Sequence, residues 1–301
     1  MSKALQAKAL VESLLKIPTV RIKNIPGTTD KLQKIIQDGR SNLHFISDFD
    51  MTMSRHWVRN KETDALERNS SSHGIPARSD IMPPEYKKET TCIYNTYYPI
   101  EIDRTMTHDE KVPYMMDWWN KAHASLIKHR LSKHDLAEMA AQVKLEMRSG
   151  IKDVLDRCKE SQVPFLVFSA GIGNIIEEIL KQANLFHENM HIVSNMMVFD
   201  EKNICVGFKE PLIHVFNKSE FQLETSPYHR MIEERTNVIL MGDSLGDLQM
   251  SQGVQHALCF NIGFLNHDIK ELEAAYTEAF DLVIEGDANM TPVIEILKSI
   301  E

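Results

Sequence analysis

Residues 43–52 read Leu-His-Phe-Ile-Ser-Asp-Phe-Asp-Met-Thr, and this stretch decides the fold class. Its first half, Leu43–Ser47, is mainly apolar and predicts a buried strand. Asp48 and Asp50 follow directly, with one residue between them. Because open α/β sheets place their functional sites beyond the carboxyl ends of their strands, this order predicts such a sheet with two carboxylates at its edge.

Two carboxylates in this spacing can both reach one phosphoryl group as the chain leaves the strand. One can attack phosphorus while the other gives a proton to the leaving oxygen. Taken alone, the pattern D-x-D also fits a solvated turn or a structural cation site. The chemical interpretation therefore needs support from elsewhere in the chain.

The rest of the chain alternates between helical and strand patterns. Apolar residues at helical spacing predict helices over residues 3–16, 151–158 and 174–183. Continuous apolar runs predict buried strands over residues 163–168 and 238–241, and residues 193–199 and 204–208 predict a hairpin. Asp30 is expected to cap a further helix that ends at Gly39.

The middle of the chain interrupts this alternation. Residues 59–80 are rich in Asn, Ser, Asp, Arg and Lys without periodicity, which predicts a loop or hairpin. Two helical patterns follow, one from Met115 to Leu126 and one from Leu136 to Met147 that Gly150 ends. These helices are expected to form a cap.

The predicted fold class is therefore α/β, a doubly wound parallel sheet with an inserted helical cap domain. We assign residues 1–58 and 146–301 to the α/β core and residues 59–145 to the cap. A length of 301 residues exceeds one average domain, which fits a core that carries an insertion.

Charge and composition limit the partners. The formal net charge of -9 repels polyanions, so neither a nucleic-acid polymer nor an anionic membrane is an expected partner. A small phosphorylated substrate would need a bound cation and a few placed Lys or Arg residues.

The ends and the cysteines give further expectations. Lys3, Lys8 and Glu12 interrupt the apolar N-terminal residues, which predicts neither a signal peptide nor a membrane span. A cytoplasmic location is therefore expected. We also expect a monomer. The four cysteines are scattered without a C-x-x-C pair, and we interpret them as buried free thiols.

Three further motifs lie beside predicted strands. Phe168–Gly171 leads into a helix and offers a hydroxyl and backbone N–H groups, which suit phosphate. Gly242–Asp247 contains two acids, and Asp243 with Asp48 would suit Mg²⁺, which prefers compact oxygen ligation. Lys218 follows an apolar run and can neutralise phosphoryl charge. Alternatively, these motifs are an ordinary turn, an acidic helix cap and a solvated surface charge.

The motifs D-x-D-x-T, S-A-G, Lys and G-D-S-x-G-D, in this order, resemble the haloacid dehalogenase superfamily of phosphotransferases. The resemblance implies that Asp48 is the nucleophile and Asp50 the general acid and base. It also implies phosphoryl binding by Ser169, Ala170 and Lys218, and a Mg²⁺ ion held by Asp48, Asp243 and the backbone carbonyl of Asp50. Ser244 and Asp247 would support this site without binding the metal directly.

Longer stretches narrow the resemblance. Six segments look like the cytosolic 5′-nucleotidase III family, namely Ile46–Thr52, Tyr97–Glu101, Pro113–Met115, Phe168–Gly173, Val193–Met196 and Leu212–Lys218. That family dephosphorylates pyrimidine nucleoside monophosphates, and its second branch prefers 7-methylguanosine monophosphate. The implied activity is a Mg²⁺-dependent 5′-nucleotidase acting on CMP, UMP and/or 7-methyl-GMP through an aspartyl phosphate, with some nucleoside phosphotransferase activity.

The resemblance also assigns the base-binding residues. Glu101 would hydrogen-bond the base, and Trp119 would stack on it, which also suits a cationic methylated purine. Trp118, its neighbour, would then face the core. Alternatively, both tryptophans only pack in the core. Ala122 stands where the family usually has a serine, and residues 59–92 differ from the family's pattern. The base preference stays open for these reasons.

Two rival interpretations remain. One is a related phosphatase that acts on another small phosphomonoester, such as phosphoserine, and needs no cap aromatic. The other is a non-catalytic nucleotide-binding protein on the same fold. The four positions at which a catalytic member needs a particular side chain carry it here: Asp48, Asp50, Lys218 and Asp243. This favours an enzyme.

Overall fold

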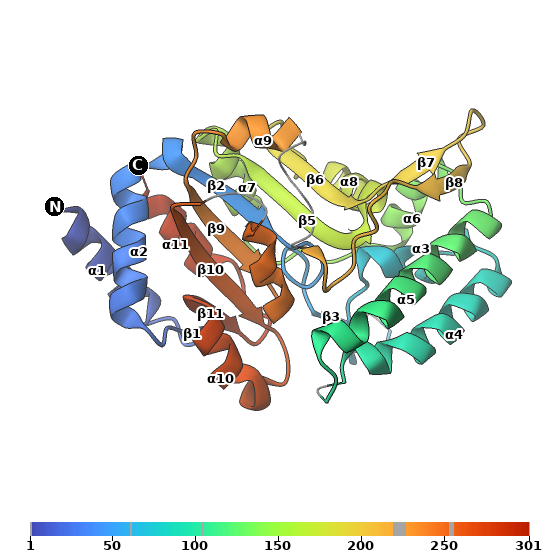
Figure 1. Ribbon diagram of the computed structural model, residues 1–301, viewed down its shortest axis with the longest axis horizontal. Helices are drawn as coiled ribbons and strands as arrows, with labels where there is room; N and C mark the ends of the chain where they lie inside the picture. Colours follow the sequence, from blue (N-terminus) through green and yellow to red (C-terminus); the bar gives the residue numbers. More distant parts are fainter. Residues whose placement is uncertain (1, 61, 104, 219–226, 253–255, 301) are drawn as a thin grey trace.

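The computed structural model describes residues 2–60, 62–103, 105–218, 227–252 and 256–300. Its centre is a seven-stranded sheet with the order β1-β11-β10-β9-β2-β5-β6 (Figure 1). The strands are β1 (Val20–Arg21), β2 (Leu43–Ser47), β5 (Phe165–Ile172), β6 (Met190–Asn195), β9 (Asn237–Gly242), β10 (Leu258–Leu265) and β11 (Leu282–Glu285). Every pair is parallel except β1 with β11.

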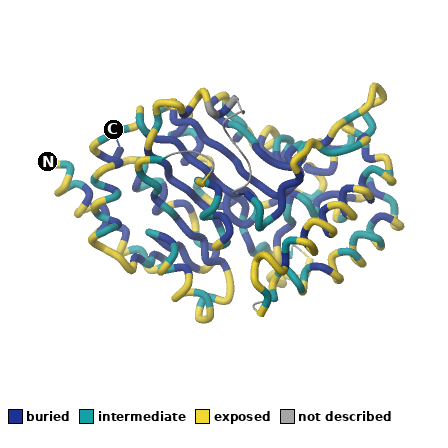
Figure 2. The backbone as a smooth tube through the Cα atoms, viewed as in Figure 1, coloured by how far each residue is buried: buried dark blue, intermediate teal, exposed yellow. Residues whose placement is uncertain are grey.

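Both faces of the sheet are covered, which is why its central strands read as continuous apolar runs. Phe45 of β2 packs in one cluster with residues of the helices on the first face, and its neighbour Ile46 packs in a second cluster on the other face. The helices of the first face are α1 (Lys3–Leu14), α2 (Ile25–Asp38), α7 (Ile151–Glu160), α8 (Gly173–Gln182) and α11 (Thr291–Ser299). On the second face lie α9 (Pro227–Ile232) and α10 (Ile269–Ala279). The buried strands form the centre of the molecule (Figure 2), and the predicted doubly wound α/β class is confirmed.

The segment between β2 and α7 begins with the hairpin of β3 (Trp57–Arg59) and β4 (Leu66–Arg68). It continues through the short helix η2 (Ser72–Gly74), then α3 (Ile75–Arg78), α4 (Pro84–Glu101), α5 (His108–Lys128) and α6 (Asp135–Val143). The helices α4 and α5 lie side by side, on the side of the molecule away from the termini (Figure 1). A second hairpin, β7 (Met197–Phe199) with β8 (Cys205–Phe208), packs against α5.

Several predicted boundaries were wrong. The helix expected to begin at Asp30 begins at Ile25, because the Asn24 side chain accepts a hydrogen bond from the Gly27 amide and caps it. Strand β5 runs on to Ile172, and its pairing with β6 is irregular between Phe168 and Ile172. Ser169–Gly171 therefore lies in the last part of this strand and not in a turn that begins a helix. Helix α6 ends at Val143, well before Gly150, because Lys144 is left-handed with φ 47°.

Two features were missed or misread. Helix α4 was not predicted, because its first half is polar and mostly exposed and Pro99 lies inside it. All four cysteines are free, but Cys92 is exposed and only Cys158 and Cys205 are buried. Among the described helices, none combines the length and the apolar character that a membrane span needs.

Candidate active site

Three neighbouring parallel strands bring the predicted acidic and hydroxyl groups to one edge of the sheet. Strand β2 pairs with β9 on one side and with β5 on the other. Asp48 follows β2, Asp243 follows β9, and Ser169 lies near the end of β5. The Asp48 amide also donates to the Met241 carbonyl over 2.9 Å, which extends the pairing of β2 with β9 into the site.

Lys218 joins two of the acids. Its Nζ lies 2.6 Å from Oδ1 of Asp48 and 2.6 Å from Oδ1 of Asp247. The side chains are almost sealed from solvent, since Lys218 is 4% exposed and Asp48 5%. Burial alone lowers the pKa of the Lys218 ammonium, but the charges of Asp247 and Asp48 outweigh it and the pKa of Lys218 is raised. The lysine is therefore a fixed positive charge and not a solvated surface residue.

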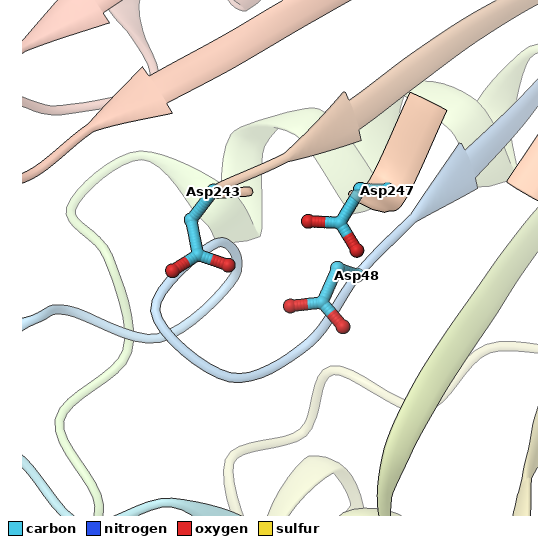
Figure 3. Close-up of side chains that lie close together, drawn as sticks. All are labelled: Asp48, Asp243 and Asp247. Carbon is cyan, nitrogen blue, oxygen red and sulfur yellow. The ribbon is translucent and has the colours of Figure 1, made fainter. Parts of the chain in front are cut away.

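The side chains of three acids lie close together (Figure 3): Asp48 after β2, Asp243 after β9, and Asp247 in the short helix η5 (Leu245–Ser251). One carboxylate oxygen from each lies within 4.8 Å of the others. Burial raises the pKa of Asp48 to about 7, with Asp247 adding to the rise and Lys218 opposing it. Burial, with repulsion from Asp48 and Asp247, also raises the pKa of Asp243 well above its usual range. One lysine does not balance these acids, so the cluster fits a divalent cation with oxygen ligands.

Asp247 is held in place by the turn in which it lies. Its Oδ2 accepts from the amide and the hydroxyl of Ser244, over 2.9 and 3.1 Å. A Cβ on Gly242 would lie 2.3 Å from the Asp247 Cβ, so only glycine leaves room for this approach. Asp243 is fixed from outside, because the Tyr276 hydroxyl donates to its carbonyl over 2.6 Å.

Asp50 points toward a different group. Its Oδ1 accepts from the Ser72 amide and its Oδ2 from the Ser72 hydroxyl, both over 2.7 Å. Burial raises the pKa of Asp50, while the two hydrogen bonds from Ser72 oppose the rise. A Cβ built on Gly171 would lie 1.9 Å from Ser72 Oγ, 3.1 Å from Asp50 Oδ2 and 3.2 Å from Ser169 Oγ. These three side chains therefore meet around the bare Gly171 Cα.

Trp119 connects α5 with the predicted phosphate-binding motif. Its indole Nε1–H donates to the Ala170 carbonyl over 2.9 Å, and the Asn195 side chain donates to the same oxygen over 2.8 Å. Trp119 is 8% exposed and Trp118 9%, so the expected contrast between a ligand-facing and a core-facing tryptophan is not seen in their exposure.

Glu101 lies at the end of α4. Burial raises the pKa of its carboxyl, while the charges of Arg68 and Lys111 oppose the rise. The Lys111 ammonium also donates to the Glu101 carbonyl over 2.8 Å. Arg68 of β4 donates to the hydroxyl of Tyr98 over 3.1 Å. The aperiodic segment thus contributes a cation beside the predicted base-binding acid.

Sequence reasoning missed two residues of η2, Ser72 and His73. The His73 ring lies 5.8 Å from that of Trp119, and burial lowers the pKa of His73 to about 4. Its Nε2 is buried without a hydrogen-bond partner among the described residues. The only available signal was a Ser-His-Gly sequence in an irregular segment, which has no distinctive spacing.

The comparisons with known proteins agree with this geometry. A model of the family "Pyrimidine 5'-nucleotidase (UMPH-1)" matches residues 51–301. The 7-methylguanosine phosphate-specific 5'-nucleotidase of Mus musculus is 40% identical over 294 residues, covering 96% of this chain and 95% of its own. The putative cytosolic 5'-nucleotidase 3 of Caenorhabditis elegans is 33% identical over 300 residues, covering 96% of this chain and 78% of its own.

Solved structures support the same assignment. A crystal structure of cytosolic 5'-nucleotidase IIIB bound to cytidine superposes with a TM-score of 0.87 at 30% identity, covering 96% of both chains. A HAD family hydrolase from Salmonella enterica superposes with a TM-score of 0.56 at 14% identity, covering 87% of this chain and 73% of its own, which supports the fold alone. The chain belongs to the pyrimidine 5'-nucleotidase (UMPH-1) family and is a phosphoric monoester hydrolase with a haloacid dehalogenase-like fold.

Proposed function

We propose that this chain is a Mg²⁺-dependent 5'-nucleotidase that hydrolyses CMP, UMP and/or 7-methyl-GMP through a phosphorylated Asp48. The observation that carries the proposal is the placement of Lys218 between Asp48 and Asp247, with Asp243 within reach of both acids. A cluster of acids around one buried ammonium suits the transfer of a dianionic phosphoryl group better than a structural role.

In the first step, a carboxylate oxygen of Asp48 forms a bond to phosphorus as the bond between phosphorus and the 5′-oxygen breaks. Asp50 gives its proton to that oxygen, and the nucleoside leaves. In the second step, Asp50 takes a proton from water, the water oxygen attacks phosphorus, and phosphate leaves Asp48. A nucleoside hydroxyl in place of water would give phosphotransfer.

The residues around the reacting atoms have separate tasks. Lys218 and the Ser169 hydroxyl would stabilise the phosphoryl oxygens, with the backbone at Ala170 beside them. A Mg²⁺ ion bound by Asp48, Asp243 and the Asp50 carbonyl would neutralise phosphoryl charge. Ser72 holds both oxygens of Asp50 in place. Burial raises the pKa of Asp50, and this rise favours the protonated form that a general acid requires.

We assign residues 59–145 to selection of the base. Glu101 would accept hydrogen bonds from the base, and Trp119 and His73, whose ring centres lie 5.8 Å apart, would offer it aromatic rings. The relatives support a nucleoside monophosphate as substrate, because one is named for 7-methylguanosine phosphate and another has cytidine, the nucleoside of CMP, bound. A cytosolic location, which the name of the nematode relative supports, and a monomeric state belong to the same proposal.

The test is phosphate release with Mg²⁺ from CMP, UMP, 7-methyl-GMP and GMP, with phosphoserine as a control substrate. We expect turnover of at least one of the first three, and no turnover by the variant Asp48→Asn although it folds. Hydrolysis of phosphoserine alone would refute the nucleotide substrate but not the phosphatase chemistry. Full activity of Asp48→Asn would refute the nucleophile.

A further inference from the structure

Arg148 is a fully buried arginine outside the acidic cluster. It lies between α6 and α7, its side chain is 1% exposed, and it is among the largest side chains with so little exposure. Burial lowers the pKa of its guanidinium to about 10, with Asp287 opposing the fall, so the group stays charged at neutral pH. A buried charge costs stability unless its hydrogen bonds are satisfied, so the partners of Arg148 indicate what it does.

The guanidinium holds the turn that follows Asp50. Its Nε donates to the Thr52 carbonyl over 2.7 Å, and its Nη2 donates to the Met51 carbonyl over 2.5 Å. Met51 has a φ of 63°, a left-handed conformation that a methionine seldom adopts. The Met51 carbonyl also accepts from the Asn266 side chain over 2.9 Å. The side chains of Arg148 and Asn266 therefore both donate to the Met51 carbonyl and stabilise this unusual backbone conformation.

The same guanidinium reaches the other side of the turn. Its Nη1 donates to the Ala288 carbonyl over 2.7 Å and lies 3.2 Å from Oδ1 of Asp287. Asp287 in turn accepts from the amides of His56 and Trp57, over 2.8 and 3.1 Å. Arg148 and Asp287 thus hold both ends of the segment that leaves Asp50.

Both connections between the predicted core and the predicted cap also pass this point. The Arg148 amide donates to the Met53 carbonyl over 2.8 Å, and the Arg55 amide donates to the Glu146 carbonyl over 3.0 Å. Ser54 and Met147 form an isolated antiparallel bridge. The segment that enters the predicted cap and the segment that leaves it are therefore paired beside the turn that follows Asp50, and Arg148 belongs to the second of them.

We propose that Arg148 is a positioning residue for the reaction: it fixes the turn that carries Asp50 and ties this turn to both connections of the cap. Arg148 does not touch the substrate. It acts through the backbone carbonyls of Met51 and Thr52, and Asn266 and Asp287 complete the arrangement. The inference rests on the proposed role of Asp50 as general acid.

The test compares leaving groups. A nucleoside 5′-oxygen needs a proton from Asp50 to leave, whereas p-nitrophenolate leaves without one. The variant Arg148→Lys keeps the charge beside Asp287 but cannot donate to all of these carbonyls. We expect its kcat/KM to fall about 100-fold for the best nucleotide, as for a misplaced catalytic group, and by less than roughly threefold for p-nitrophenyl phosphate.

Two further variants calibrate the result. Asp50→Asn should show the same selective loss in kcat/KM, because it removes the acid of the first step. Loss of the base in the second step lowers kcat for both substrates but does not enter kcat/KM, since the leaving group has already departed. Arg235→Lys is the matched control, since Arg235 donates to the carbonyls of Arg40, Leu43 and Gln162 at the opposite end of β2. It should lower thermal stability without distinguishing the two substrates.

The outcomes separate the two proposals. Equal losses on both substrates for Arg148→Lys, beside a selective loss for Asp50→Asn, would refute the positioning role alone. Equal losses for Asp50→Asn would refute the acid and the positioning role with it. If Arg148→Lys does not fold, Asn266→Ala removes the second donor to the Met51 carbonyl and must show the selective loss for the proposal to stand.

Discussion

Replacing Gly171 with alanine would put a methyl group where the Ser72 hydroxyl now lies. The added Cβ would be 1.9 Å from Ser72 Oγ, and ordinary contact begins near 3.4 Å, so the hydroxyl must move by roughly 1.5 Å. That shift breaks the 2.7 Å hydrogen bond from Ser72 to Asp50. We expect turnover of the best nucleotide to fall about 100-fold, and the free energy of unfolding to fall by about 1–3 kcal/mol through overpacking.

A double-mutant cycle identifies the cause. Ser72→Ala removes the hydroxyl that clashes, so Gly171→Ala should add little further loss of activity on that background. Gly207→Ala is the control, since a Cβ there meets nothing within 4 Å. Turnover is measured by phosphate release and stability by urea unfolding. Additive losses in the cycle, or full activity of Gly171→Ala, would refute the reasoning.

Three further predictions concern charge. Lys218→Met leaves the buried acids without the ammonium group, so the free energy of unfolding should fall by about 3 kcal/mol. Added Mg²⁺ should partly restore it. Thermal melts with and without Mg²⁺ test this, and an unchanged melting temperature would contradict it. Mg²⁺ at 100 times its Kd should stabilise the wild type by about 2.7 kcal/mol and should not stabilise Asp243→Asn, as calorimetry and melting can show; equal stabilisation of both would exclude Asp243 as a ligand. Burial, with the charge of His73, lowers the pKa of His123 to about 3. Below about pH 6.5, His123 therefore binds a proton in the unfolded chain but stays neutral in the folded protein. This difference lowers the free energy of unfolding by about 1.4 kcal/mol at about pH 5.5. His123→Phe should remove this part of the fall in urea unfolding between pH 7.5 and 5.5, and identical pH dependence in both proteins would contradict it.

The sheet and its acidic edge were predictable because they depend on local patterns. Strand β2 was placed at Leu43–Ser47 to the residue, since both of its faces are buried and its apolar run is continuous. Asp48 and Asp243 follow such strands directly, and the parallel pairing of β2 with β9 brings them together. Lys218 was assigned from the resemblance, because a single lysine after an apolar run has no local signature.

The residues that hold the site were not predictable from local patterns. Ser72 reaches Asp50 across 22 positions in the chain, and it lies in a segment without helical or strand periodicity. Arg148 follows the predicted second cap helix, where a lone arginine reads as a solvated charge. Its burial follows from carbonyls of Met51, Thr52 and Ala288, and tertiary packing alone brings these together.

The acidic composition and the anionic substrate become compatible at this site. The whole chain carries a formal net charge of -9, which by itself repels a phosphate ester. Within the cluster, Asp48, Asp243 and Asp247 face one buried lysine, and burial raises the pKa of Asp48 to about 7. Such an excess of buried negative charge costs stability until a cation binds. A divalent cation would relieve more of this cost than a monovalent one, and it would offset the negative charge that Lys218 leaves unbalanced where the phosphoryl group binds.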